Sequence, residues 1–126
     1  MSPPLVLLAE DDEDVRALAE LVLRREGYEV TAVADGQAAL EAADERTPAL
    51  AVLDVSMPRM DGVDAARRLR ERPETHDVPI ILLTARVTEA DRARGREAGV
   101  DDQLDKPFSP AVLAERVRAL LEGRPA

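Results

Sequence analysis

Three short runs of aliphatic residues constrain the fold of this chain more strongly than any other feature of its sequence. They are Leu5–Ala9, Leu50–Leu53 and Val78–Leu83. Because polar and apolar positions do not alternate in them, each predicts a strand that is buried on both faces, as in a parallel sheet covered by helices. Two weaker strand candidates are Val30–Ala34 and Asp102–Asp105.

Helical patterns fill the intervals between these strands. In Val15–Glu26 the apolar residues cover an arc of roughly 200° when plotted at about 100° per residue. The remaining helical patterns are Gly36–Arg46, Val63–Arg70, Glu89–Ala98 and Pro110–Leu121, the last with Ser109 as its expected N-cap. Five strand–helix units with right-handed crossovers predict a doubly wound α/β sandwich.

Length and composition narrow the class of protein. The 126 residues suit one domain, which we expect to span residues 1–126 with an ordered core from about 4 to 122. A net charge of -9 argues against nucleic acid as a direct partner. The chain has no cysteine, and its first apolar run is too short for a signal peptide or a membrane span, so we expect a cytoplasmic protein without a membrane partner.

The first aliphatic run leads directly into five acidic residues: Glu10, Asp11, Asp12, Glu13 and Asp14. The last three lie at the start of a predicted helix, where a capping oxygen and negative charge are favourable. The first two belong to the strand end, and the carboxyl ends of parallel strands meet at one edge of the sheet. We therefore expect Glu10 and Asp11 to face Asp54, which ends the strand Leu50–Leu53.

Three neighbouring carboxylates disfavour one another's ionised forms unless a cation offsets their charge. Hard oxygen ligands of this kind suit Mg²⁺. The same edge should also receive Thr84 and Lys106, the latter being the only lysine among 17 basic residues. A carboxylate that attacks phosphorus needs its charge partly neutralised, and a compact ammonium can contact both carboxylate and phosphate oxygens.

Four segments in this order resemble the receiver (CheY-like) domain of a two-component response regulator over essentially the whole chain. They are EDD after the first strand, LDVSMPRMDG around the third, LLTA on the fourth and GVDDQLDKPF around the fifth. The resemblance implies a flavodoxin-like (βα)5 fold with a five-stranded parallel sheet in the order 2-1-3-4-5. It also implies a cis peptide bond before Pro107.

The resemblance further implies that Asp54 is phosphorylated by a sensor histidine kinase or a phosphotransfer protein. The implied ligands of Mg²⁺, or of Mn²⁺ as a substitute, are Asp11, Asp54 and the backbone carbonyl of Ser56, with Glu10 assisting. Lys106 is implied to contact Asp54 and then the phosphoryl oxygens.

Thr84 is implied to be the hydroxyl that moves to bind the phosphoryl group. The expected result is a switch in the surface of the fourth strand and helix and the fifth strand and helix, which controls a downstream protein or an attached output domain. Such a chain is a phosphoacceptor signalling domain, not an enzyme, apart from self-catalysed phosphotransfer and autodephosphorylation.

Several positions depart from the family pattern or carry separate expectations. Gln103 stands where the family usually has Tyr or Phe. Because glutamine has no ring to bury, we expect the signal to be passed on mainly through Thr84 and the following loop. Arg96 replaces a large apolar residue, which argues against a hydrophobic dimer face on the fourth helix. Ser56 and Arg86 occupy positions that affect phosphoryl lifetime in such domains. We expect Leu21 to be buried against the last helix, with exposure toward a partner as the alternative.

Three other functions remain as alternatives. Asp12 and Asp14 have the spacing of an aspartyl-nucleophile phosphatase, but they lie in a helix start rather than at a strand end. A flavodoxin-type cofactor binder would need a phosphate-binding loop and aromatic residues that this sequence lacks. A degenerate receiver that only binds partners is disfavoured because every phosphorylation residue is present.

Overall fold

The computed structural model describes residues 3–85 and 88–123, in which strands and helices alternate. The strands are β1 (Leu5–Ala9), β2 (Glu29–Val33), β3 (Leu50–Asp54), β4 (Ile80–Thr84) and β5 (Asp102–Asp105). The helices are α1 (Glu13–Arg25), α2 (Gly36–Glu45), α3 (Gly62–Glu71), α4 (Glu89–Glu97) and α5 (Pro110–Leu121). Within the described ranges, this order of elements confirms the five predicted strand–helix units.

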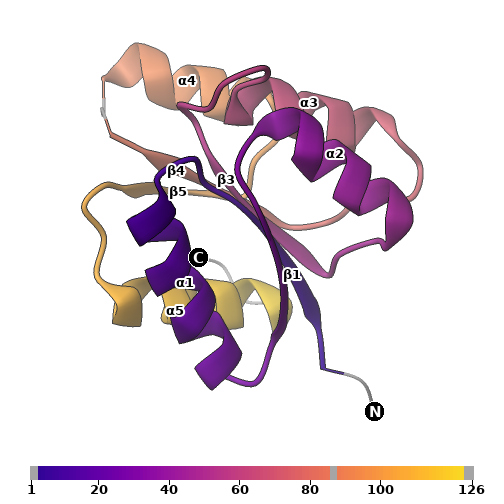
Figure 1. Cartoon of the computed structure of the whole chain (residues 1–126). Coiled ribbons are helices and arrows are strands. Elements are labelled where there is room, and N and C mark those ends of the chain that lie inside the picture. Colours follow the sequence, from indigo (N-terminus) through magenta and orange to yellow (C-terminus); the bar gives the residue numbers. More distant parts are fainter. Residues whose placement is uncertain (1–2, 86–87, 124–126) are drawn as a thin grey trace.

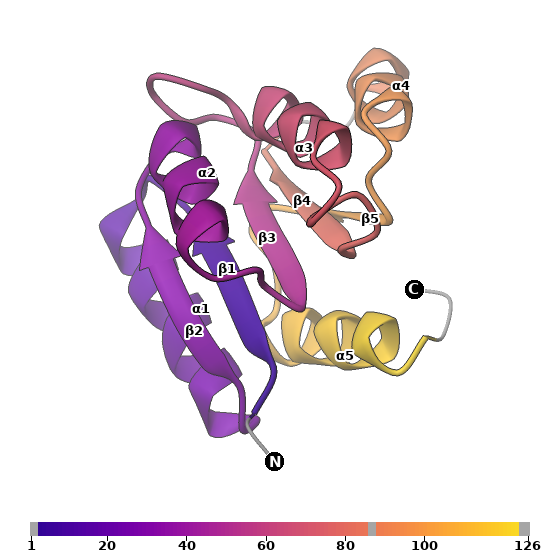
Figure 2. The same ribbon diagram turned by 90° about the vertical axis from the view of Figure 1, so that its right-hand side faces the viewer.

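All five strands pair in parallel, in the order β2-β1-β3-β4-β5, which confirms the expected topology. Helices α1 and α5 cover one face of the sheet, and α2, α3 and α4 cover the other (Figure 1). The view turned by 90° shows the sheet between these two layers of helices (Figure 2). The fold is therefore a three-layer sandwich.

Aliphatic residues fill both faces of the sheet because successive side chains of a strand point to opposite sides. In β3, for example, Leu53 packs into the core under α2 and α3, whereas Val52 packs into the core under α1 and α5. Both residues are fully buried. This two-sided burial explains why the three central strands have no polar residue before their ends.

The structure moves several predicted element boundaries. The run Val78–Leu83 becomes a strand only from Ile80, because Pro79 has no N–H and Val78 instead donates to the carbonyl of Thr75 in the preceding turn. The expected strand Val30–Ala34 lies one residue earlier, as β2. Ser109 is the N-cap of α5 by position, but its side chain makes no capping hydrogen bond.

The expectation that Leu21 is buried against α5 is wrong. Its side chain is 46% exposed, and Leu18, one turn earlier on α1, is 45% exposed. Leu23 is fully buried in the core formed with α5. Because two residues along a helix differ by about 200° in direction, Leu21 and Leu23 cannot both face the sheet.

Among the described residues, no helix is both long and apolar enough to span a membrane.

Leu23 and Leu21 provide a matched pair of leucines on one helix for a stability test. Replacing fully buried Leu23 by Ala should lower the free energy of unfolding by about 2–5 kcal/mol, because it leaves a cavity in the core. Replacing Leu21 by Ala should change it by no more than about 0.5 kcal/mol, as for most surface positions. Urea unfolding followed by circular dichroism measures both values; equal losses would contradict the burial described here.

Candidate functional site

The register of the sheet brings the ends of four strands together. Ala9 of β1 lies opposite Leu53 of β3, so the next residues, Glu10 and Asp54, are neighbours. Thr84 of β4 lies opposite Asp105 of β5, and the N–H of Lys106 donates to the carbonyl of Thr84 at 2.7 Å. The edge predicted from sequence therefore does collect the carboxylates, the hydroxyl and the lysine.

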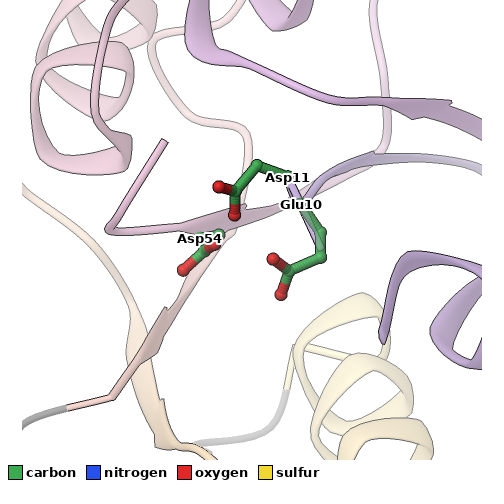
Figure 3. Close-up of side chains that lie close together, drawn as sticks. All are labelled: Glu10, Asp11 and Asp54. Carbon is green, nitrogen blue, oxygen red and sulfur yellow. The ribbon is translucent and has the colours of Figure 1, made fainter. Parts of the chain in front are cut away.

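Glu10, Asp11 and Asp54 form a compact group, called here the acidic cluster. A carboxylate oxygen of each lies within 4.8 Å of an oxygen of the other two. Figure 3 shows Glu10 and Asp11 projecting from the end of β1 toward Asp54 at the end of β3. Glu10 is 0% and Asp54 2% exposed, whereas Asp11 is exposed. Two of the three charges are thus removed from water, and the third borders solvent.

Lys106 provides the positive charge that lies against the buried part of the cluster. Its Nζ is 2.6 Å from Oε1 of Glu10 and 3.2 Å from Oδ2 of Asp54. The ammonium therefore contacts Glu10 more closely than Asp54, a pairing that the sequence did not predict. Among the described residues, neither of these two buried oxygens has a hydrogen-bond partner of regular geometry. Both retain capacity to bind a cation or a proton.

Backbone groups hold the other carboxylate oxygens. The N–H of Asp12 donates to Oε2 of Glu10 at 3.1 Å, and the N–H of Ser56 donates to Oδ1 of Asp54 at 3.3 Å. Asp12 itself is the N-cap of α1, where its side chain accepts a hydrogen bond from the N–H of Val15 at 3.0 Å. This confirms the capping explanation for Asp12 and leaves no observation that favours a phosphatase.

The site shifts the pKa values of its titratable groups. Burial, together with the neighbouring carboxyls of Glu10 and Asp11, raises the pKa of Asp54 to about 8, against the opposing charge of Lys106. Burial alone would lower the pKa of the Lys106 ammonium, but its contacts with Glu10 and Asp54 raise that pKa above its ordinary value. With no further cation, the protonated form of Asp54 is therefore favoured at neutral pH.

Thr84 borders the open side of the site. It is 6% exposed and lines a cavity of about 200 Å³ together with Val55, Ser56, Ala85 and Asp91. This places Thr84 and Ser56 around one space beside Asp54. Arg86, the other position expected to affect phosphoryl lifetime, lies outside the described residues.

Two residues support the site and were not recognised as doing so from the sequence. A Cβ on Gly62 would lie 2.3 Å from the backbone carbonyl oxygen of Asp54, so only glycine permits the close approach of α3 to the end of β3. Arg16 donates from Nη1 to the carbonyl of Glu10 at 3.0 Å. The Asp–Gly pair at 61–62 is a sequence signal for the first, whereas the contact of Arg16 has no local sequence signal.

The peptide bond between Lys106 and Pro107 is cis, as expected from the resemblance.

Comparisons with known proteins agree with this geometry. Residues 6–118 match a family model described as the response regulator receiver domain. The chain is 46% identical to the transcriptional regulatory protein CseB of Streptomyces avermitilis over 116 aligned residues. The aligned region covers 92% of this chain and 48% of that regulator. The chain thus spans about half the length of the curated relatives that it matches.

Solved structures give the same result. A putative response regulator from Chloroflexus aurantiacus has a TM-score of 0.90 and 39% identity, over 95% of this chain and 98% of that chain. The receiver domain of the sensor histidine kinase PA1611 from Pseudomonas aeruginosa, solved with a magnesium ion coordinated in its active-site cleft, has a TM-score of 0.86. Its identity is 36%, over 96% of this chain and 98% of that chain.

The raised pKa of Asp54 predicts how stability depends on pH in metal-free buffer. The pKa of Asp54 is higher in the folded than in the unfolded state. The contribution of this carboxyl to the free energy of unfolding is therefore fully present below about pH 4 and is lost as the pH rises toward about 8. Asp54→Asn should remove this loss. The variant should therefore gain several kcal/mol of stability relative to wild type between pH 4 and pH 8.5, because each unit of pKa shift corresponds to about 1.4 kcal/mol.

Urea unfolding across this pH range in EDTA measures the difference. Glu41→Gln, which neutralises an exposed carboxylate on α2, provides the control and should give no such pH-dependent gain. A stability difference between wild type and Asp54→Asn that is independent of pH would contradict the raised pKa.

Proposed function

This chain belongs to the response regulator receiver domain family of two-component systems, and from that premise we propose that Asp54 accepts a phosphoryl group from a histidine kinase or a phosphotransfer protein. The observation that carries the proposal is the position of Asp54. It ends a buried strand, is 2% exposed, and lies between two further carboxylates and Lys106. A buried carboxylate with a strongly raised pKa among further titratable groups is typical of a functional site.

The proposed reaction is a direct phosphoryl transfer. An oxygen of Asp54 forms a bond to phosphorus as the bond from phosphorus to the donor's imidazole nitrogen breaks, and the imidazole leaves with the electron pair. Lys106, already 3.2 Å from Oδ2 of Asp54, neutralises negative charge on the incoming phosphoryl oxygens. Thr84 is proposed to donate its hydroxyl to the same group. Hydrolysis of the acyl phosphate restores the Asp54 carboxylate.

We assign a divalent-ion site to Asp11, Asp54 and the backbone carbonyl of Ser56, with Glu10 assisting. Three carboxylate oxygens within 4.8 Å of one another provide the hard donors that Mg²⁺ prefers, and Mn²⁺ could replace it. The buried oxygens of Glu10 and Asp54 without a regular hydrogen bond support the assignment. When bound, the ion supplies positive charge that favours the ionised form of Asp54 and offsets phosphoryl charge.

The proposed output is a change in the surface formed by β4, α4, β5 and α5. Thr84 ends β4, and α4 begins five residues later. A movement of the Thr84 hydroxyl would therefore act on the segment that connects β4 to α4. The proposed target of this change is a downstream protein or an attached output domain. Both targets are consistent with transcriptional regulatory relatives that are about twice as long. A cytoplasmic location, and one receiver domain over residues 1–126, are proposed on the same basis.

An apolar groove on α1 is the proposed docking site for the phosphodonor protein. Its volume is about 330 Å³, and it is lined by Val15, Leu18, Lys106, Pro107 and Phe108. Lys106 connects this groove to Asp54, so a partner seated there would hold its phosphohistidine beside the acceptor. The exposed side chain of Leu21 extends the same apolar face. Such an unpaired apolar surface is typical of a protein interaction site.

Phosphorylation of Asp54 can be tested without a partner protein. Incubation with acetyl phosphate and Mg²⁺ should add the mass of one phosphoryl group to wild type and none to Asp54→Asn, because the amide is not a nucleophile of comparable strength. Intact-protein mass spectrometry measures the gain. Glu41→Gln is the matched control and should behave like wild type. A folded wild type that gains no mass would refute the proposal.

The apolar groove predicts a difference between protein and small-molecule donors. Leu18→Ser should slow phosphorylation by a phosphorylated histidine kinase domain about tenfold or more, since central apolar contacts contribute most to such interfaces. The rate with acetyl phosphate should remain within about twofold of wild type because the change leaves the acidic cluster intact. Rates are followed with radiolabelled donors; equal slowing with both donors would show that Leu18 acts on the site rather than on docking.

A further inference from the structure

The side chain of Gln103 connects β5 to the middle of α4. Its Nε2 donates a hydrogen bond to the backbone carbonyl of Arg92 at 3.0 Å. That carbonyl lies within helix α4, where carbonyls normally accept hydrogen bonds from the helix's own backbone. Here it also accepts one from a side chain of another element. Figure 2 shows α4 lying over the edge of the sheet where β5 runs. Gln103 therefore bridges the last strand and the helix above it.

Gly95 leaves the space that this amide occupies. A Cβ at Gly95 would lie 2.5 Å from Nε2 and 2.7 Å from Cδ of Gln103, well inside contact distance. Among the described residues of α4, Gly95 is the only buried one. A glycine in the interior of a helix is unfavourable relative to alanine. Its presence here is explained by the passage of the Gln103 side chain.

The other contacts of α4 with the body of the protein are weak. Arg92 lies 3.6 Å from Asp105 and Arg94 lies 3.8 Å from Asp61, and the side chains of these pairs are between 33% and 51% exposed. Solvent screens ion pairs of this kind, so each contributes little. Gly95 is the one buried residue among the described residues of α4. The hydrogen bond of Gln103, at 3.0 Å, is a closer polar contact between α4 and β5 than the ion pair of Arg92 with Asp105.

We propose that Gln103 is a positioning residue that holds α4 in its unphosphorylated arrangement, and that Gly95 is required because it admits the Gln103 amide. The proposal rests on the proposed function, in which a change at Thr84 displaces α4. Gln103 is three residues before Lys106, whose backbone N–H is bonded to the carbonyl of Thr84. Any shift of α4 relative to β5 must break the bond to Arg92 and therefore opposes the phosphorylated state.

From the sequence, the absence of a ring at Gln103 led us to expect output mainly through Thr84 and the following loop, whereas here the Gln103 amide itself takes part. Because ligand binding and conformation are linked, a contact present only in the unphosphorylated arrangement lowers the affinity for a phosphoryl group at Asp54. Removing the contact must raise that affinity by the same factor. The Gln103 amide would thus set how readily the domain switches, without touching the reacting atoms.

The first experiment tests the contact in the unliganded protein through a double-mutant cycle. Gly95→Ala should lower the urea midpoint in the wild-type background, because the new methyl group displaces the Gln103 amide. In the Gln103→Ala background the same change should raise the midpoint, since only the higher helix propensity of alanine remains. Hydrogen exchange of α4 should be faster in Gln103→Ala than in wild type, while exchange in β1 and β3 stays unchanged.

The second experiment tests the effect on switching, with beryllofluoride plus Mg²⁺ as the phosphoryl probe. Gln103→Met keeps the length of the side chain but removes the donor. It should bind the probe about fivefold more tightly than wild type, the factor that corresponds to one ordinary hydrogen bond. Gln103→Asn is the control for a shorter side chain that keeps an amide: it cannot span the same distance and should behave like Gln103→Met.

Each outcome decides a separate point. Unchanged exchange of α4 in Gln103→Ala, or a loss of stability from Gly95→Ala in both backgrounds, would overturn the positioning role. Faster exchange of α4 with unchanged affinity of Gln103→Met for beryllofluoride would overturn the link to phosphorylation. Failure of wild type itself to bind the probe would instead refute the proposed function, while the cycle in the unliganded protein still tests the contact between Gln103 and α4.

Discussion

The contact of Lys106 with two buried carboxylates is the interaction on which the site depends. Glu10 follows the end of β1 and Asp54 ends β3, yet the ammonium that contacts both belongs to Lys106, the residue after the edge strand β5. Removing two carboxylates from water is unfavourable unless charge and hydrogen bonds replace the lost hydration. One lysine does this only in part, which is why the pKa of Asp54 remains high. The acidic cluster therefore holds more negative charge than the ammonium of Lys106 offsets.

That incomplete neutralisation is possible because the surrounding sheet is rigid. The strands that carry Glu10 and Asp54 are buried on both faces by aliphatic residues, and close packing of this kind resists local rearrangement. Gly62 lets α3 approach the carbonyl of Asp54, and Arg16 binds the carbonyl of Glu10. The carboxylate of Asp54, the proposed acceptor, is therefore held in position by neighbouring groups that have no part in the proposed reaction. Helix α4 differs, because polar and weak ionic contacts hold it.

Local patterns predicted most of the fold and the candidate site, and the failures have physical causes. The aliphatic runs identified the strands because only a sheet covered on both sides buries such segments. Val78 was assigned to a strand because the pattern ignored the missing N–H of Pro79. Leu21 was assigned to the core because a wide apolar arc does not show where burial stops. The pairing of Glu10 with Lys106 has no local signal, since 96 residues separate them in sequence.

The sequence by itself determined the alternation of strands and helices and the set of residues at the carboxyl edge, since both follow from local spacing and residue chemistry. Its four motifs also resembled the family to which the chain belongs. The tertiary structure alone decided which carboxylate the lysine contacts most closely, which leucine of α1 is exposed, and how Gln103 uses the space beside Gly95. These outcomes depend on the distances between elements that are remote in sequence. No local pattern encodes such distances, because the packing of the whole chain sets them.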